Sequence, residues 1–323
     1  MAYYLGIDGG GSKTTCVVGD EVSLLAKVTA GPSNITRVGE TRARDTLQKA
    51  IREACADANI APQQVRRACI GAAGTGRADV ADVVHGIVAE MIFGEIEVVG
   101  DMQVARAAAF GEGPGVIVIA GTGSMAYGCD AQGRTARAGG WGFAISDEGS
   151  AHWIGCAAVS ALLRVIDQSE DSQSTAEASL LFGEITAAWR LGSLDELVRA
   201  ANADSHFARL FPAVLAAADV GDTIAQRVLE QAGRELAQLA AIVVRRLFSE
   251  DLVAENPVEE NNGNLPAALL ALAGGVFRHS STVREVFRHE IRRLDPRLEV
   301  NPQTVEPVAG ALQMARVDGT RLR

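Results

Sequence analysis

Three glycine-containing turns, each directly after an apolar run, are the segments of this 323-residue chain best suited to hold an anion. They are Asp8-Gly9-Gly10-Gly11-Ser12-Lys13-Thr14-Thr15, Gly121-Thr122-Gly123-Ser124 and Gly274-Gly275. Apolar residues resume after the first two turns, which predicts strand, turn, strand, whereas a helix is predicted over 281–294 after the third. Glycine lets backbone N–H groups approach a ligand, and nearby hydroxyls add donors, so phosphates are the usual occupants. Each turn alone is equally compatible with a tight hairpin, so the three together indicate the site.

Two named phosphate motifs do not fit these turns. A P-loop needs glycine directly before lysine and a helix afterwards, but Ser12 precedes Lys13 and a strand is predicted to follow. Residues 121–126 match the dinucleotide pattern G-x-G-x-x-A, but Gly128 and Gly133 would break the helix that must follow it. A dinucleotide-binding fold is therefore a poor match.

A carboxylate, Asp101, follows the predicted strand 95–99 and precedes a helical pattern over 104–110. An aspartate at the carboxyl end of a strand in an open α/β sheet lies at the edge where ligands bind, which makes it a candidate general base. Aspartate is also a preferred helix N-cap. Both roles remain open, and they are compatible.

Residues 139–150 are the densest group of candidate ligand-binding residues. Trp141 stands between two glycines, and Asp147 and Glu148 precede a helix predicted over 151–167. A flat aromatic face beside a carboxylate suits a sugar, although Asp147 could instead cap the helix and Trp141 could belong to the core. Asn34, in the turn 31–34, offers an amide that can both donate and accept toward a polyol, but alone it indicates only a turn.

Composition limits the class of protein. The chain has 30 Lys+Arg against 40 Asp+Glu, a formal charge of −10, which disfavours a nucleic-acid or anionic-membrane binder. No apolar run approaches the ~18 residues of a membrane span, and the five cysteines fit no zinc spacing, so they are predicted to be reduced core thiols. We expect a cytoplasmic protein of about two domains.

Taken together, these segments resemble the N-acetylglucosamine kinase group of the BadF/BadG/BcrA/BcrD family, within the actin, hexokinase and heat-shock-70 ATPase superfamily. Residues 8–14 resemble its first phosphate motif, 121–124 its second and 273–276 its adenosine motif. The stretch 139–154 is the most specific part of the resemblance. Met102 and Ser146 depart from the family pattern, which usually has Ala and Gly there, and Ser146 puts the identity of the sugar in doubt.

The resemblance implies a role for each matching residue. Asp101 corresponds to the catalytic base, and Asp8 is expected to orient a Mg²⁺ ion. The implied sugar-binding residues are Asn34, Gly140, Trp141, Gly142 and Asp147. The implied ATP-binding residues are Gly10, Gly11, Ser12, Lys13, Thr14, Thr122, Gly123, Ser124, Gly274, Gly275 and Arg278. A homodimer is also implied.

The fold implied by the resemblance is a two-domain, actin-like (ribonuclease H-like) α/β fold with mixed sheets around a central cleft. The expected domains are 1–113 plus 308–323, and 114–307 with a mainly helical insert at about 165–266. Within that insert the acidic, polar stretch 251–266 is expected to be an exposed loop. The turn over 71–76 is expected to lie at the same cleft.

The expected activity is ATP-dependent phosphorylation of the 6-hydroxyl of an amino sugar, with N-acetylglucosamine as the first-ranked acceptor. N-acetylmuramic acid and glucosamine remain alternative acceptors. An ATPase activator of an acyl-CoA dehydratase or reductase shares the phosphate turns but needs paired cysteines for an iron–sulfur cluster, which this chain lacks. A non-catalytic sugar- or nucleotide-responsive binding protein is a third possibility.

Overall fold

The chain forms two compact units, which are described separately below. A computed structural model describes all residues except 76, 172–173, 175–177, 204–205, 254–267 and 318–323. Unit 1 comprises Met1–Gly113 and Val305–Arg323, and unit 2 comprises Pro114–Thr304. Among the described residues, no helix is long and apolar enough to cross a membrane.

Unit 1 is built on a five-stranded mixed sheet in the order β3-β2-β1-β4-β5. The strands are β1 (Tyr3–Gly9), β2 (Thr14–Gly19), β3 (Leu24–Ala30), β4 (Val65–Ala72) and β5 (Glu95–Gly100). β1, β4 and β5 are parallel, whereas β1–β2 and β2–β3 are antiparallel hairpins. The predicted strand, turn, strand at residues 3–19 is confirmed.

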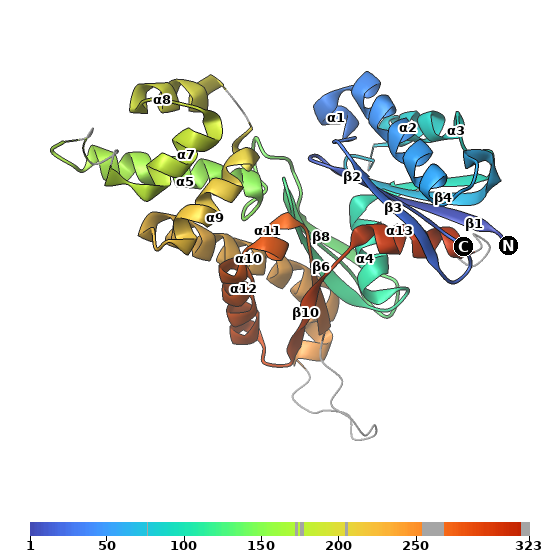
Figure 1. The fold of residues 1–323 in the computed structure, drawn as a ribbon. Helices are drawn as coiled ribbons and strands as arrows, with labels where there is room; N and C mark the ends of the chain where they lie inside the picture. The colour runs from blue at the N-terminus through green and yellow to red at the C-terminus, as the bar shows by residue number, and fades with distance from the viewer. Residues whose placement is uncertain (76, 172–173, 175–177, 204–205, 254–267, 318–323) are drawn as a thin grey trace. The chain divides into compact units, whose positions relative to one another are not determined.

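Helices cover both faces of this sheet. Alternate residues of β1 point to opposite faces, and apolar side chains on each face pack against helices. The helices are α1 (Ile35–Val38), α2 (Glu40–Asp57), α3 (Ala78–Ala89), α4 (Asp101–Phe110) and α13 (Pro307–Arg316), with a 3₁₀ turn at Pro62–Gln64. Leu5 and Ile7 pack with α2 and α3, whereas Tyr4 packs toward α4 and α13. The C-terminal helix α13 therefore lies among N-terminal elements (Figure 1).

Unit 2 repeats this topology with a sheet in the order β8-β7-β6-β9-β10. The strands are β6 (Gly115–Ala120), β7 (Ser124–Cys129), β8 (Thr135–Gly139), β9 (Ala268–Ala273) and β10 (Leu298–Val305). β6 forms a hairpin with β7 and lies parallel to β9, as β1 does with β2 and β4. The second glycine turn is therefore the topological counterpart of the first.

The helices of unit 2 lie mainly between β8 and β9. They are α5 (Ala151–Asp167), α7 (Leu180–Trp189), α8 (Leu194–Ala203), α9 (Phe211–Asp219), α10 (Thr223–Val253), α11 (Gly275–His279) and α12 (Ser281–Leu294), with a 3₁₀ turn at Phe207–Leu210. The loop predicted from residue 251 is wrong for 251–253, which belong to α10; buried Leu247 and Phe248 anchor that helix, and helix propagation then needs little further support. Residues 254–266 of the predicted loop lie outside the described residues.

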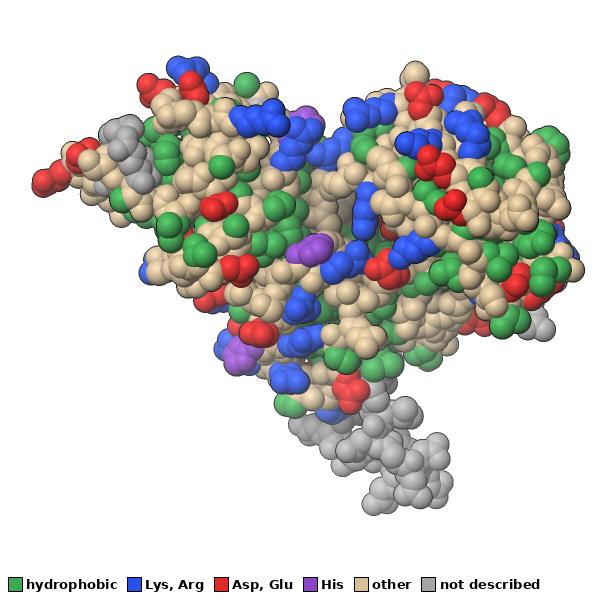
Figure 2. All heavy atoms as spheres, viewed as in Figure 1, with side chains coloured by type: hydrophobic (Ala, Val, Ile, Leu, Met, Phe, Trp, Pro, Cys, Tyr) green, Lys and Arg blue, Asp and Glu red, His purple; other side chains and the backbone are tan. Residues whose placement is uncertain are grey.

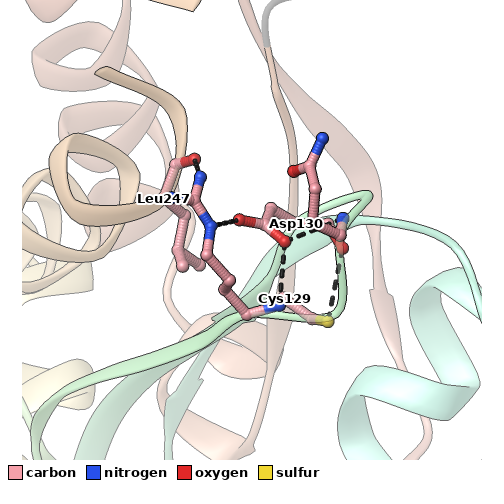
Figure 3. A network of polar contacts seen from close by, with 5 residues as sticks. Cys129, Asp130 and Leu247 are labelled. Carbon is pink, nitrogen blue, oxygen red and sulfur yellow. Dashed lines mark hydrogen bonds and ion pairs between the residues drawn. The ribbon is translucent and has the colours of Figure 1, made fainter. Parts of the chain in front are cut away.

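The turn between β7 and β8 is fixed by Asp130, which is 5% exposed (Figure 3). Its carboxylate accepts the backbone N–H groups of Gln132 and Arg134, both at 2.9 Å, and the Arg134 Nε at 2.5 Å. The same guanidinium donates to the Leu247 carbonyl of α10 at 3.5 Å. The hairpin is thus tied to the longest helix of the unit.

The prediction that all five cysteines are core thiols is only partly right. All are free, and Cys16, Cys55 and Cys69 are buried. Cys129 is half-buried, and Cys156 is exposed, because it lies on the face of α5 that points away from the core. Chain composition does not reveal which helix face a small residue occupies.

Candidate active site

In unit 1 the first glycine turn and Asp101 lie at one edge of the sheet. The carboxyl ends of β1, β4 and β5 coincide, since Gly9 pairs with Ala72 and Ala72 pairs with Gly100. Asp8 and the turn after it therefore share an edge with Asp101. Within the turn, the Gly10 N–H donates to the Lys13 carbonyl at 3.0 Å.

The loop after β4 joins the same edge. Gly71 and Ala72 prove to be the last residues of the strand, and the Thr75 hydroxyl donates to the carbonyls of Ala72 and Val99 at 2.7 and 2.8 Å. This loop is therefore tied to the end of β5, next to Asp101. Its expected place at a cleft stays a prediction, and Gly76 lies outside the described residues.

Asp101 is the first residue of α4, and Gly100 is the N-cap, so the capping role considered for Asp101 is wrong. One carboxylate oxygen accepts the N–H of Met102 at 2.9 Å. Burial raises the pKa of Asp101 above its ordinary value of 3.8, against the opposing effect of hydrogen bonds from the backbone N–H groups of Met102 and Asp101 itself. A half-buried carboxylate with a raised pKa is a stronger proton acceptor.

Asn34 lies next to the first turn through its neighbour Ser33. The Ser33 N–H donates to the Gly10 carbonyl at 3.3 Å, and the Thr14 hydroxyl donates to the Ser33 hydroxyl at 2.7 Å. Asn34 caps α1, its side-chain oxygen accepting the Thr36 N–H at 3.1 Å and the Thr36 hydroxyl at 2.7 Å. Its oxygen is thus engaged, and its NH₂ group is the part suited to a ligand. The role of Ser33 in fixing this loop was not predicted from the sequence.

In unit 2 the structure brings the second and third glycine turns together. β6 and β9 are parallel neighbours, with Ile119 paired to Ala273, so their turns begin side by side. A Cβ on Gly274 would lie 2.2 Å from the Ala120 carbonyl oxygen and 3.0 Å from the Gly121 nitrogen. Only glycine allows that approach, and its φ of +100° also favours glycine.

Arg278 lies on α11, directly after the third turn. Its carbonyl accepts a hydrogen bond from Arg284 of α12 at 3.1 Å. Figure 2 shows Arg and His side chains gathered over α11 and α12, a local positive region in an acidic chain. Such a region suits the phosphates of a nucleotide.

The Gly140-Trp141-Gly142 segment leaves the sheet after β8, and both glycines have positive φ, +72° and +99°. Trp141 is 66% exposed, so the alternative that it belongs to the core is wrong; the glycines turn the chain outward. The Arg137 guanidinium lies 4.5 Å from the centre of the Trp141 ring. Sequence reasoning missed Arg137, although its position four residues before Trp141 was visible.

Asp147 lies further along the connection between β8 and α5, and it is only 6% exposed. Its carboxylate accepts the backbone N–H groups of Gly142 and Ser124. Burial raises its pKa, assisted by the charge of Glu148 and opposed by those two hydrogen bonds. Ser150 is the N-cap of α5, accepting the Trp153 N–H, so the capping alternative for Asp147 is wrong.

A magnesium site must be built from few protein ligands. Within the described parts of the chain, no three His, Cys, Asp or Glu side chains gather to hold a metal. Mg²⁺ in nucleotide sites is typically bound by one or two carboxylates, phosphate oxygens and water, and Asp8 beside the first turn fits that requirement.

Comparison with known proteins agrees with this architecture. The chain is 31% identical to an N-acetylmuramic acid/N-acetylglucosamine kinase of Clostridium acetobutylicum over 98% of this chain and 99% of that protein. It is 28% identical to an N-acetyl-D-glucosamine kinase of Dictyostelium discoideum over 97% of each. The solved structure of a provisionally assigned N-acetylglucosamine kinase from Chromobacterium violaceum shares the fold, with a TM-score of 0.73, 23% identity and coverage of 98% of this chain and 99% of that one.

The duplicated mixed sheets and their paired glycine turns define a two-domain, actin-like α/β protein of the kind found among sugar kinases. The sequence model of the BadF/BadG/BcrA/BcrD ATPase family matches residues 5–315. The chain belongs to that family.

Proposed function

We propose that this protein is an ATP-dependent amino sugar kinase that phosphorylates the 6-hydroxyl of N-acetylglucosamine. The observation that carries the proposal is the arrangement in unit 2. The exposed ring of Trp141 and the carboxylate of Asp147 both belong to the connection between β8 and α5, and the carboxylate is bonded to the second glycine turn. An aromatic sugar surface is thereby joined to a phosphate-binding turn. N-acetylglucosamine is the substrate common to the names of both relatives.

In the proposed reaction the sugar O6 attacks the γ-phosphorus of ATP. The O6–phosphorus bond forms, the bond from the γ-phosphorus to the β,γ-bridging oxygen breaks, and ADP leaves. The carboxylate of Asp101 accepts the proton of the 6-hydroxyl. Because the transition state of phosphoryl transfer is loose, positioning and charge stabilisation contribute more than activation of the nucleophile.

The glycine turns are proposed to supply that stabilisation. Backbone N–H groups and the hydroxyls of Ser12, Thr14, Thr122 and Ser124 are the donors available to phosphate oxygens. A bound Mg²⁺, oriented by Asp8, would neutralise phosphate charge. Gly274, Gly275 and Arg278 are proposed to hold the adenosine end.

The test is the rate of Asp101→Asn with ATP and N-acetylglucosamine. The amide keeps the size of the side chain but cannot accept the proton, so kcat should fall by about 10²–10⁴-fold, with sugar and ADP affinities nearly unchanged by calorimetry. N-acetyl-6-deoxyglucosamine should bind but not react. Turnover of that analogue would exclude the 6-hydroxyl, and a wild-type rate in Asp101→Asn would remove Asp101 from its role.

N-acetylmuramic acid is a second candidate acceptor, favoured by Arg137. This guanidinium is exposed beside Trp141, and it forms no ion pair within the part of the chain that the structure describes. Muramic acid differs from glucosamine by a lactyl carboxylate, for which a guanidinium is the natural partner. Arg137→Ala should raise KM for N-acetylmuramic acid about twofold to fivefold, the size of an exposed ion pair, and leave KM for N-acetylglucosamine unchanged. Equal effects on both sugars would contradict this role.

A further inference from the structure

The second glycine turn is hydrogen-bonded along its length to the start of α5. The Ala151 N–H donates to the Gly121 carbonyl at 2.9 Å, and the His152 N–H donates to the Thr122 carbonyl at 3.4 Å. The Ser124 hydroxyl donates to the Glu148 carbonyl at 2.6 Å. The conformation of the turn is therefore stabilised by hydrogen bonds to residues 147–152 as well as by its own hairpin.

The side chain of Asp147 is bonded both to this turn and to the Gly-Trp-Gly segment. Its carboxylate accepts one N–H from Ser124 and one from Gly142. It also lies against Gly123, where an added Cβ would be 2.7 Å from the Asp147 Oδ2. The contact is thus direct, and it requires glycine at position 123.

Two features of Asp147 are unfavourable by themselves and must be compensated by its contacts. Asp147 has a φ of +69°, in the left-handed region that residues other than glycine seldom occupy. Its carboxylate is buried, and burial of a carboxylate without hydrogen bonds is unfavourable. The two backbone N–H groups compensate for that cost, so the carboxylate and the two loops stabilise one another.

We propose that Asp147 is a positioning residue for the nucleotide as well as a sugar contact. It fixes the second phosphate turn, so affinity for ADP depends on Asp147 even when no sugar is present. A carboxylate has about four acceptor positions, and two remain for a sugar hydroxyl after the backbone bonds are made. By thermodynamic linkage, a sugar bound to this carboxylate and a nucleotide bound to the turn then alter one another's affinity equally. The inference rests on the proposed function only for the identity of the sugar.

The test is ADP affinity measured by calorimetry without any sugar. Asp147→Asn replaces one acceptor oxygen by an NH₂ group that cannot accept an N–H, and the dissociation constant for ADP should rise about tenfold, as expected for loss of a hydrogen bond to a charged group. Ser150→Ala is the matched control: it removes the N-cap of α5 in the same segment but leaves both Asp147 bonds in place. It should lower the melting temperature without changing ADP affinity.

An unchanged ADP affinity in Asp147→Asn would overturn the proposal, and so would equal losses in both variants, since those would reflect general loosening. The reciprocal measurement is N-acetylglucosamine affinity without nucleotide. Gly123→Ala should weaken it several-fold by displacing the carboxylate, whereas Gly121→Ala, whose Cβ would meet nothing within 4 Å, should not. Equal sugar affinity in the two alanine variants would also contradict the proposal.

The proposed kinase activity and the positioning role of Asp147 can be contradicted separately. If the wild-type protein neither binds nor phosphorylates an amino sugar, the proposed function fails, yet the ADP comparison can still be made. If the wild-type protein is an active kinase and Asp147→Asn binds ADP normally, only the positioning role fails.

Discussion

Asp101 and Asp147 are both carboxylates whose pKa is raised by burial, but their hydrogen bonds differ. Asp147 accepts N–H groups from two separate loops, whereas Asp101 accepts only its own N–H and that of Met102. Asp147 is therefore fixed between backbone segments, as a positioning group should be. Among the described residues, the carboxylate of Asp101 bonds to no second segment, as a proton acceptor for a ligand requires.

The pH dependence of activity should report Asp101. Protonation removes its capacity as a base, so kcat/KM should fall as pH is lowered through its folded-state pKa, which lies above 3.8. The measurement is a pH profile of kcat/KM for wild type and Asp101→Asn. The residual activity of the variant should lack this acid limb, and an identical limb in the variant would assign it to another group.

The raised pKa values of Asp101 and Asp147 also determine how the free energy of unfolding changes with pH. Between 3.8 and the raised folded-state pKa, Asp101 and Asp147 bind more protons in the folded than in the unfolded state. Their contribution to the free energy of unfolding therefore increases as pH falls through that window. Loss of activity there, with circular dichroism unchanged, would be chemical and not due to unfolding of these sites.

At the scale of elements, much of the fold was predictable because glycine and apolar runs mark it. The predicted hairpins around the first two glycine turns and the predicted helices 151–167 and 281–294 agree with the structure. The helix after Asp101 starts three residues earlier than its apolar pattern, since its first turn is stabilised by the Gln103 side chain, which accepts the Gly100 N–H at 2.8 Å. Local polar bonds of this kind leave no periodic signal.

The environments of the site residues were not predictable from the sequence. Residue type and spacing were enough to identify Trp141 and Asp147 as candidate sugar-binding residues. The exposure of Trp141 and the burial of Asp147 depend on contacts that form only in the folded chain. The hydrogen bond from the Ser124 N–H to the Asp147 carboxylate joins residues 23 positions apart in the sequence. Arg137 carried no motif, and only its stacking on Trp141 identifies it.

The helix that begins with Asp101 is positioned by unusually close packing. A Cβ on Gly310 of α13 would lie 2.0 Å from the Val104 carbonyl oxygen of α4, and one on Gly71 of β4 would lie 2.2 Å from a Val104 methyl group. Both contacts are with the first turns of α4. Any added methyl group must therefore move the helix that holds the proposed base.

Gly310→Ala should consequently lower both stability and kcat. Overpacking of this kind lowers the free energy of unfolding by about 1–3 kcal/mol, and displacement of Asp101 should reduce kcat more than it changes KM. Urea denaturation and steady-state kinetics measure the two effects. Gly86→Ala in α3, where a Cβ would meet nothing within 4 Å, is the control and should raise stability by about 0.5–1 kcal/mol. A normal kcat in Gly310→Ala would show that α4 tolerates the shift.

At the scale of the whole molecule, the duplicated topology explains why the two glycine-containing hairpin turns come as a pair. β1, β2 and β4 correspond to β6, β7 and β9, so the loop that ends β4 corresponds to the Gly274 turn that ends β9. Each unit thus presents a hairpin turn and a neighbouring loop at one sheet edge. The unequal part is the helical insert between β8 and β9, which forms most of the core of unit 2.

Unit 1 is completed only by the C-terminal end of the chain. Ala311 and Ala315 of α13 form a core cluster with Cys69 and Val104, and Arg316 donates to the carbonyls of Asp20 and Ser23, both at 2.8 Å. A Cβ on Gly6 would lie 2.5 Å from the Leu312 nitrogen, so α13 packs directly on the central strand. Loss of α13 would expose one face of the sheet.

A protein ending at residue 304 should therefore lose the structure of unit 1 and keep that of unit 2. All three tryptophans, at 141, 153 and 189, belong to unit 2, so their fluorescence should be retained.

Burial raises the pKa of Cys55 to about 11 and that of Cys69 to about 12, which makes both thiols unreactive while unit 1 is folded. In the truncated protein these thiols and Cys16 should react with a disulfide reagent as fast as exposed Cys156 does. A peptide of residues 305–317 added in trans should restore their protection, and a scrambled peptide should not. Protection of the three thiols without any peptide would show that the sheet of unit 1 is stable without α13.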